Sequence, residues 1–359
     1  MNKAFWNNRS VLLTGHTGFK GSWMSLWLQS LGAKLTGYAL APQTNPSMFD
    51  AVDAAKGMDH RIADIRDRQA MLDAVQAAQP EVVIHMAAQP LVRLSYDEPV
   101  ETFDTNVMGT VNLLDACRQC PSVRSVVVVT TDKCYENREW IWGYREDEAM
   151  GGHDPYSASK GCAELVTSAY RRSFFQRGDG MHPARLATAR AGNVIGGGDW
   201  ALDRLIPDMV QAFSRGDEVV IRSPHAIRPW QHVLEPLGAY LLLAEKLHAG
   251  TDDFAEAFNI GPNQSDAQPV SWIVDRMTAS WSDSASWRLD DQVQPHEATS
   301  LHLDISKAMA RLNWKPTLDL AQAIDWLVAW YRAFYEGSTD MRELTLSQIS
   351  QFMNGIESK

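Results

Sequence analysis

The sequence predicts an α/β fold with a doubly wound parallel sheet and a smaller C-terminal α/β lobe. Three observations lead to this prediction. Short apolar runs typical of buried strands alternate with amphipathic helical segments over about the first 190 residues. The first apolar run leads through a glycine-rich turn directly into a helix. After residue 190 the alternation becomes irregular, as expected where a second, smaller unit begins.

Composition argues against two classes of partner. The chain has 359 residues and a formal net charge of -11, without a basic block that could line a nucleic-acid groove. No apolar stretch approaches the roughly 20 residues that span a bilayer, and the start MNKAFWNNRS lacks a signal-peptide core. We expect a cytoplasmic protein without nucleic-acid or membrane partners. Its four cysteines suit reduced structural thiols, and the pair Cys117 and Cys120 has no second Cys/His pair to complete a metal site.

The first element is a short apolar strand over residues 11–14, and a turn with the spacing GxxGxxG follows it. Glycines at these positions allow a tight turn, close approach of the backbone to a pyrophosphate and close helix packing. The helix predicted over residues 22–31 adds N–H groups and the positive end of its dipole. We interpret the turn as dinucleotide-binding, and its candidate residues are Gly15, Thr17, Gly18, Phe19 and Gly21.

The second strand, predicted over residues 34–39, should end near an adenosine ribose. Dinucleotide-binding units usually place an acidic residue there, whereas this chain continues with Tyr38 to Pro42. The motif therefore does not choose between NAD and NADP. Asp64 and Ile65 are candidates to approach the adenine ring, although Asp64 equally fits a loop or cap residue before the helix predicted over 67–78.

The next strand, over residues 81–85, is followed by Ala87, Ala88 and Gln89, where small side chains let the backbone approach a cofactor. A helix is predicted over 103–118. Its Asn106 either braces the active site through the backbone or is a satisfied structural asparagine.

The central motif begins at the end of a buried strand over residues 125–129 and reads Thr130, Thr131, Asp132 and Lys133. After a polar loop, Tyr156 and Lys160 open a helix. A tyrosine and a lysine four apart share one helical face, so the ammonium group makes the phenol easier to ionise. Such a pair is suited to take the proton of a sugar or alcohol hydroxyl, and a loop as long as 136–155 is usually functional.

The later elements are less regular. A strand over residues 186–190 leads into a glycine-rich loop that contains Asn193, and a helix begins at Arg204 and Leu205. Arg228 and Trp230 form a cationic and aromatic cluster that either holds a diphosphate and stacks a base or consists of ordinary surface and core residues. A strand near 258–261, a helix and strand over 270–289 and two closing helices complete the chain, the last over 318–335.

The motifs TGHTGFKG, HMAAQP, TTDKCYEN, YSASK and RAGNVIGGGDW occur in this order. With them the sequence resembles the extended short-chain dehydrogenase/reductase family, and within it the branch of nucleotide-sugar 4,6-dehydratases. The segments GHTGFKGSW, AAQPLVRLSY and GNVIGGGDW, with TDK in place of the commoner TDE, are most similar to the subgroup acting on CDP-glucose. The resemblance extends from Arg9 to about Tyr335.

The resemblance implies two domains and an oligomer. A Rossmann-type NAD-binding domain would span 1–190, rejoined by roughly 233–265, and a nucleotide-sugar-binding lobe would comprise 191–232 and 266–359. Family members usually form homodimers in which helices corresponding to 103–118 and 156–175 make a four-helix bundle, and some dimers pair into tetramers. The implied pathway supplies 3,6-dideoxyhexoses for surface polysaccharide such as O-antigen.

The resemblance also assigns roles to residues. NAD is the implied cofactor, and Tyr156 and Lys160 are the implied catalytic pair, with Thr131, Asp132 and Lys133 at the elimination site. The implied cofactor-binding residues are Gly15, Thr17, Gly18, Phe19, Gly21, Asp64, Ile65, Ala87, Ala88, Gln89, Asn106, Thr130, Tyr156 and Lys160. The implied substrate-binding residues are Asn193, Arg204, Leu205, Arg228, Trp230 and His296, and no metal ligand is implied.

The implied reaction removes hydrogen from C4 of the sugar, eliminates water across C5 and C6, and returns hydride to C6. Lys133 stands where the branch usually has a glutamate as the C5 base, so its assignment to that step rests on position alone. A 4-epimerase on the same fold needs Tyr156 and Lys160 but no acid for O6, so Asp132 favours the dehydratase. A cofactor-sensing binding protein is the remaining alternative, and the retained Tyr-Lys pair disfavours it.

Overall fold

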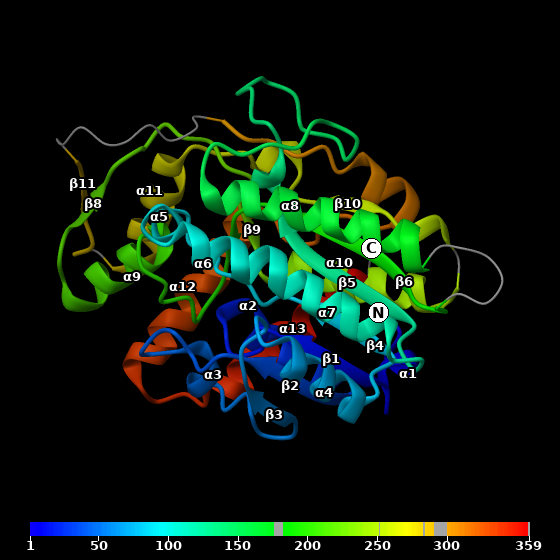
Figure 1. The fold of residues 1–359 in the computed structure, drawn as a ribbon. Helices are drawn as coiled ribbons and strands as arrows, with labels where there is room; N and C mark the ends of the chain where they lie inside the picture. Colours follow the sequence, from blue (N-terminus) through cyan, green and yellow to red (C-terminus); the bar gives the residue numbers. More distant parts are fainter. Residues whose placement is uncertain (176–181, 251, 283, 291–299, 358–359) are drawn as a thin grey trace.

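A computed structural model describes residues 1–175, 182–250, 252–282, 284–290 and 300–357. Seven parallel strands form the central sheet in the order β10-β6-β5-β4-β1-β2-β3 (Figure 1). The strands are β1 Ser10–Thr14, β2 Lys34–Ala39, β3 Asp59–Ile62, β4 Val82–His85, β5 Ser125–Thr131, β6 Arg185–Ala191 and β10 Ala257–Ile260. The predicted doubly wound parallel sheet is thereby confirmed.

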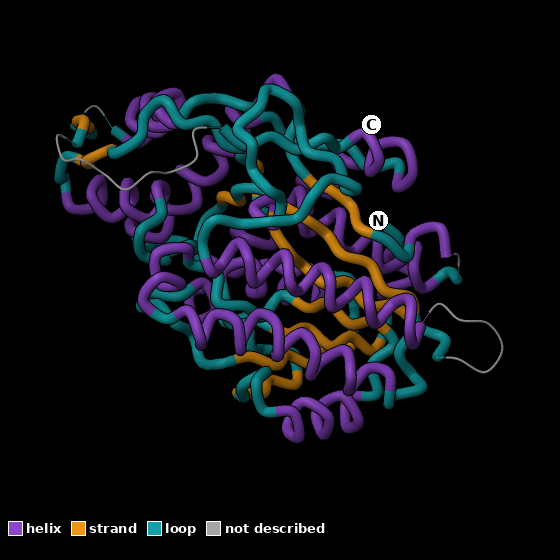
Figure 2. The backbone as a smooth tube through the Cα atoms, turned by 45° about the horizontal axis from the view of Figure 1, so that its top comes forward, coloured by secondary structure: helices purple, strands orange, loops and turns teal. Residues whose placement is uncertain are grey.

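Helices cover both faces of this sheet, and Figure 2 shows the strands enclosed between them. Helices α2 (Phe19–Ser30) and α10 (Leu234–His248) pack on one face, whereas α4 (Arg68–Ala78), α7 (Gly109–Arg118) and α8 (Pro155–Tyr170) cover the other. Alternate side chains of the central strands β1, β4, β5 and β6 enter two separate cores, because successive strand residues point to opposite faces. In β5, Val127 points into the core shared with α2 and α10, and Val126 points into the core shared with α4 and α7.

The remaining elements build the lobe beside the sheet and complete the helical layers. They are α1 Lys3–Trp6, α3 Met48–Ala51, α5 Val92–Asp97, α6 Pro99–Phe103, β7 Val194–Ile195, α9 Leu205–Arg215, β8 Val219–Ile221, β9 Gln231–His232, α11 Val270–Trp281, β11 Trp287–Leu289, α12 Leu320–Glu336 and α13 Met341–Glu357. Strands β8 and β11 pair in one small parallel sheet, and β7 and β9 pair in another. The domain boundaries expected from the resemblance stay a prediction.

Two helices differ from expectation. The helix expected over 103–118 is the end of a longer one, in which α6 and α7 are joined by a π-helical turn, Asp104–Met108. The C-terminal helix α13 was not predicted, because its buried face includes the polar residues Thr345 and Gln348 beside the apolar Ile349 and Phe352. These polar residues weaken the apolar periodicity. Ile349 and Phe352 are fully buried. These two side chains join the core on the α2 side of the sheet.

No described helix is long and apolar enough to cross a bilayer.

Candidate active site

The glycine-rich turn lies between β1 and α2, at the carboxyl end of the sheet. Gly15 has φ +77°, and a Cβ added there would lie 2.7 Å from the Ala87 nitrogen. A Cβ on Gly21 would overlap the Gly15 carbonyl. Gly18 precedes α2 without a side-chain cap, so the first N–H groups of the helix have no such partner. The turn is a glycine cradle closed by backbone contacts that a side chain at Gly15 or Gly21 would disrupt, which is the tight turn that pyrophosphate-binding units use.

Two other residues of the turn are tied to neighbouring segments. The Thr17 hydroxyl donates to the Leu40 carbonyl at 2.8 Å, which connects the turn with the end of β2. The Phe19 ring lies against Gly196, where an added Cβ would come within 3.3 Å of it. Phe19 therefore joins the first turn of α2 to the glycine-rich loop after β6.

Lys20 is a site residue that the sequence reasoning missed. Its ammonium group lies 3.3 Å from the Tyr240 hydroxyl on α10. Burial, followed by the charges of Lys160 and Arg204, lowers the pKa of Lys20 to about 7. A lysine beside the glycine motif was the available signal, but its neighbours are distant in the sequence.

The segments expected to face an adenosine contain Tyr38 and Asp64, and Arg66 forms ion pairs with both Asp64 and Glu101. Tyr38 donates to the Asp64 carbonyl at 2.8 Å, and the Asp64 carboxylate binds Arg66 at 2.6 Å. Hydrogen bonding by Arg66 lowers the pKa of Asp64. Ile65 is buried under Gly109 of α7, so its side chain has a packing role.

The loop after β4 is held by Asn106 from the π-helical turn. Asn106 accepts a hydrogen bond from the Gln89 nitrogen at 2.8 Å, and its amide donates to the Gln89 carbonyl at 3.1 Å and to Ser159 at 2.8 Å. The Gln89 side chain bonds within its own region, to Leu91 and Thr102. The bracing geometry that the sequence left as one of two alternatives for Asn106 is therefore present, and it links this loop to α8.

Tyr156 and Lys160 lie on the first two turns of α8, which Asp154 caps by accepting from the Ser157 nitrogen at 2.8 Å. Burial raises the pKa of Tyr156 to about 12, although hydrogen bonding with Thr131 opposes this shift. Burial lowers the pKa of Lys160 to about 8, against the charge of Glu164. The Lys160 ammonium donates to the Val129 carbonyl at 3.3 Å.

The residues at the end of β5 face different ways. Thr130 donates to Glu164 at 2.5 Å, whereas Thr131 donates to the Asp132 Oδ1 at 2.9 Å. Asp132 is fully buried, and its Oδ2 has no hydrogen-bond partner in the described part of the chain. Lys133 lies 3.4 Å from Asp132 Oδ1 and donates to Asn193 at 3.2 Å. An unpartnered carboxylate oxygen beside Tyr156 is suited to exchange a proton with a bound molecule.

The expected substrate-binding residues are placed around this centre with differing roles. Arg204 donates to Asp199 at 2.9 Å, and its charge acts on both Tyr156 and Lys20. Leu205 starts α9 and is partly buried against the main core. Arg228 donates to the carbonyl of Ile227 at 2.9 Å.

Trp230 is buried, and its indole N–H has no partner among the described residues. Pro229, next to it, lies beside Gly192, which also neighbours Asp132. The 228–230 segment therefore runs close to Asp132. His296 lies outside the described residues.

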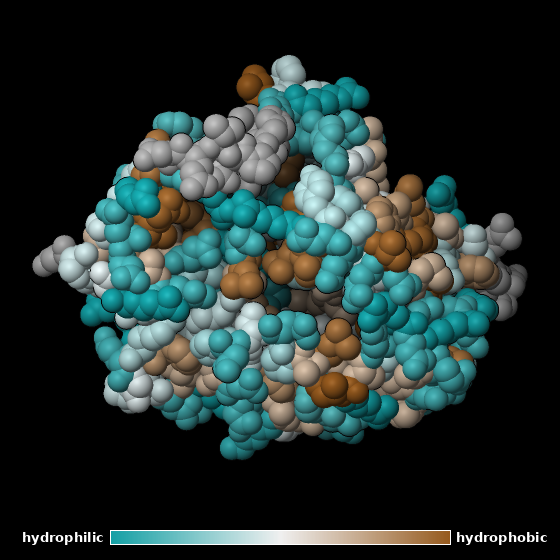
Figure 3. Space-filling view, turned by 60° about the vertical axis from the view of Figure 1, so that its left-hand side comes forward, coloured by the Kyte–Doolittle hydropathy of each residue, from teal (hydrophilic) through white to brown (hydrophobic). Residues whose placement is uncertain are grey.

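The strands end at one face of the molecule. Figure 3, which brings the left-hand side of Figure 1 forward, shows that this face is hollowed near its centre. Within the described ranges no group of three His, Cys, Asp or Glu side chains is arranged to hold a metal ion.

Comparison with known proteins gives a family and relatives that match over nearly the whole chain. The family model described as GDP-mannose 4,6 dehydratase matches residues 12–326. CDP-glucose 4,6-dehydratase of Salmonella typhimurium is 52% identical over 355 residues, covering 99% of each chain. A dTDP-glucose 4,6-dehydratase of Streptomyces griseus is 28% identical over 89% of this chain and 93% of its own.

Solved structures share the fold at low identity. A dTDP-glucose 4,6-dehydratase from Bacillus anthracis in complex with NAD is 22% identical with a TM-score of 0.75, over 91% of this chain and 98% of that one. A UDP-glucose-4-epimerase from Stenotrophomonas maltophila with bound NAD is also 22% identical, with a TM-score of 0.78, over 92% of this chain and all of that one.

Proposed function

The chain belongs to the GDP-mannose 4,6-dehydratase family, and on that premise we propose that it converts CDP-glucose into CDP-4-keto-6-deoxyglucose and water. It is an NAD-dependent lyase of the extended short-chain dehydrogenase/reductase family. The observation that carries the substrate assignment is the 52% identity with the Salmonella CDP-glucose 4,6-dehydratase over 99% of both chains. Identity at this level without a gap in coverage extends through the sheet and the lobe alike.

The arrangement around the glycine cradle supports this chemistry. Gly15, Gly18 and Gly21 would hold the pyrophosphate of NAD at the start of α2, because no side chain fills that space. Bound NAD supplies a hydride acceptor for C4 of the sugar and a donor for C6. The loop at Ala87 and Ala88, fixed by Asn106, would border the reactive ring.

The protein's own residues manage the protons. Tyr156 would take the proton from O4, assisted by the Lys160 ammonium group, and Thr131 would orient the same oxygen. Asp132 would donate a proton to the departing O6, because its Oδ2 is buried and unpartnered within the described residues. Lys133 would remove the C5 proton, which requires its neutral form.

A labelled substrate tests this proposal. CDP-glucose with deuterium at C4 should give a 4-keto-6-deoxy product that carries the deuterium at C6. Inversion at C4 would instead indicate an epimerase, and no turnover with any nucleotide sugar would indicate a sensing protein. Turnover compared across CDP-, dTDP-, GDP- and UDP-glucose tests the base, and equal or better use of another base would contradict the CDP assignment.

We also propose a homodimer that pairs the helices around 103–118 and 156–175. Several large apolar side chains on these helices and on the adjoining α5 and α6 are exposed: Tyr96, Val100, Phe103, Met108, Leu165 and Phe174. An apolar surface of this kind marks a protein contact. The four cysteines are free, which suits the reducing cytoplasm as the site of action.

A further inference from the structure

Glu164 is a buried carboxylate that the proposed reaction does not use directly. It lies on α8 one turn beyond Lys160, and it is 4% exposed. Its Oε1 accepts from Thr130 at 2.5 Å, and its Oε2 accepts from Thr188 at 2.7 Å and from Arg190 at 2.9 Å. All these partners are buried as well. Burying a charge is costly unless it is paired and hydrogen-bonded, as this one is.

These contacts join three elements at the depth of the active site. Thr130 belongs to β5 and immediately precedes Thr131 and Asp132, whereas Thr188 belongs to β6. Glu164 therefore fixes the end of the strand that carries the elimination residues against the helix that carries Tyr156 and Lys160. The hydroxyls of Thr130 and Thr188 make the same kind of bond to the same carboxylate, but Thr130 directly precedes Thr131 and Asp132, whereas Thr188 lies five residues before Asn193.

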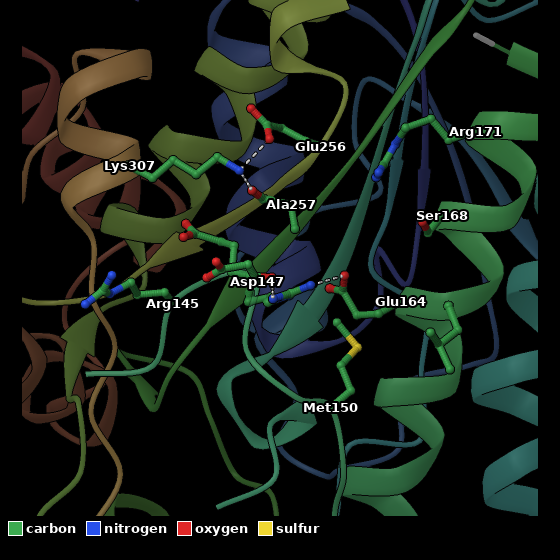
Figure 4. A pocket seen from close by; sticks show the side chains of 12 residues that line it. Arg145, Asp147, Met150, Glu164, Ser168, Arg171, Glu256, Ala257 and Lys307 are labelled. Carbon is green, nitrogen blue, oxygen red and sulfur yellow. Dashed lines mark hydrogen bonds and ion pairs between the residues drawn. The ribbon is translucent and has the colours of Figure 1, made fainter. Parts of the chain in front are cut away.

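Arg190 continues this set of contacts away from the active site. Its guanidinium donates to the Tyr135 hydroxyl at 2.8 Å, and Tyr135 donates to Asn259 on β10 at 2.6 Å. Glu164 and Arg190 also line a cavity of about 430 Å³ on the side of α8 toward β10, where Lys307 binds Glu256 (Figure 4). The Glu164–Arg190 pair thus separates this cavity from the Lys160 side of α8.

We propose that Glu164 is a positioning residue for the dehydratase reaction. It holds Thr131 and Asp132 at the end of β5 in register with Tyr156 and Lys160 on α8, and it places a negative charge one helical turn from Lys160. This inference rests on the proposed function. A small displacement between reacting groups is enough to lower the rate of a reaction strongly.

Two matched variants separate positioning from stability. Thr130→Val and Thr188→Val each remove one hydroxyl donor from Glu164 without changing side-chain size or charge. Both should lower the melting temperature by similar amounts. Only Thr130→Val should lower kcat, by about tenfold, the rate equivalent of one charged hydrogen bond. The KM for CDP-glucose should stay within about twofold of wild type for both, because neither hydroxyl faces the lobe.

Equal kcat values for the two variants, whether both lowered or both unchanged, would overturn the inference. A wild-type protein that does not turn over CDP-glucose would contradict the proposed function instead. The Thr130 and Thr188 variants would then be compared on whichever nucleotide sugar the wild type oxidises.

A second variant, Glu164→Gln, keeps the shape and removes the charge. Lys160 is also faced by Lys20 from α2, His85 from β4 and Cys134 from the segment after β5, and among these groups and Glu164 only Glu164 is a carboxylate. The alkaline limb of kcat should therefore move to lower pH in Glu164→Gln. Glu256→Gln is the control, because it removes a paired carboxylate of the same cavity that contacts neither β5 nor Lys160. If the alkaline limb of the kcat–pH profile lies at the same pH in Glu164→Gln and in wild type, the charge of Glu164 does not act on Lys160.

Discussion

At the scale of single residues, the central feature is a pair of buried ionisable groups, Tyr156 and Lys160, whose pKa values burial moves apart. Burial raises the pKa of Tyr156 to about 12 and lowers that of Lys160 to about 8. Their proximity on one helical face favours the pair of phenolate and ammonium over either charge alone. The positive charge of Arg204 opposes burial and lowers the pKa of the Tyr156 phenol.

The pKa of Lys160 predicts that the reaction rate falls on the alkaline side of its pH profile. Below about pH 8 Lys160 is charged and assists ionisation of Tyr156; above it the proton and the assistance are lost. The rate of hydride transfer from C4, measured in a single turnover by NADH absorbance, should therefore fall as pH rises through about 8. Lys160→Met should be slower by about a hundredfold and should lack this limb. A limb that persists in Lys160→Met would assign it to another group.

Asp132 should be required for elimination but not for oxidation. Asp132→Asn keeps the size of the side chain but cannot give up a proton, so loss of O6 should slow by at least about a hundredfold. NADH should then accumulate on the enzyme after C4 oxidation, which absorbance detects directly. Asp73→Asn, on the exposed side of α4, is the matched control with wild-type behaviour expected. Wild-type product formation by Asp132→Asn would remove Asp132 from the acid role.

Lys133 presents a separate test. Its ammonium nitrogen lies 3.4 Å from Asp132 Oδ1, and a base for C5 must be neutral, so exchange of the C5 proton is the measurement that decides its role. Lys133→Ala should oxidise C4 but exchange the C5 proton with solvent at least about a hundredfold more slowly than wild type. If Lys133→Ala exchanges the C5 proton at the wild-type rate, Lys133 is not the C5 base, and Glu136 or Tyr156 are the remaining candidates.

The residues that the sequence identified are those defined by local spacing. The Tyr156 and Lys160 pair and the three glycines are visible because their relation is set within a single turn or helix. Lys20 and Glu164 were missed, since their partners lie 220 and 34 residues away, on α10 and β5. Such contacts depend on the order of strands in the sheet, which single segments do not determine.

At the scale of elements, the exposed edge strand β3, with the sequence DHRI, was not predicted. Inner strands such as β4 and β5 were predictable, because both faces of a parallel sheet are buried and each of these strands is a nearly continuous apolar run. The π-helical turn before α7 was not predictable, because it accompanies three hydrogen bonds that Asn106 makes with Gln89 and Ser159, which are distant in the sequence. The local sequence DTNVM has no signal of its own for it.

The β1–turn–α2 unit yields a graded prediction. Gly21→Ala would force a Cβ into the Gly15 carbonyl, so the turn must open and NAD affinity should fall by at least about tenfold. Gly18→Ala, where the nearest atom would be 3.5 Å away and φ is -76°, should cost less affinity. Titration of each apoprotein with NAD, followed by intrinsic fluorescence, measures both. Equal losses would show that the cradle does not depend on the Gly21 contact.

At the scale of the whole molecule, the exposed apolar surface on α6, the π-helical turn and α8 lies on the outer side of the helices that fix the active site. Leu165 is 62% exposed, one residue after the buried Glu164. Pairing of this surface with a second copy would therefore cover the helix layer that carries Tyr156 and Lys160. The oligomer and the catalytic geometry would then share the same helices.

Charge introduced on this surface should separate the subunits. Leu165→Glu combined with Met108→Glu places two carboxylates where apolar side chains would meet, and burying unpaired charges there costs several kcal/mol. Light scattering coupled to gel filtration should show a dimer or tetramer for wild type and a monomer for the double variant. Leu289→Glu, an equally apolar and half-exposed position on β11, is the control that should keep the wild-type mass. Because α8 would lose its cover, the monomer should also have a lower kcat, and a monomer with wild-type kcat would show that α8 is held by the sheet and Glu164 alone.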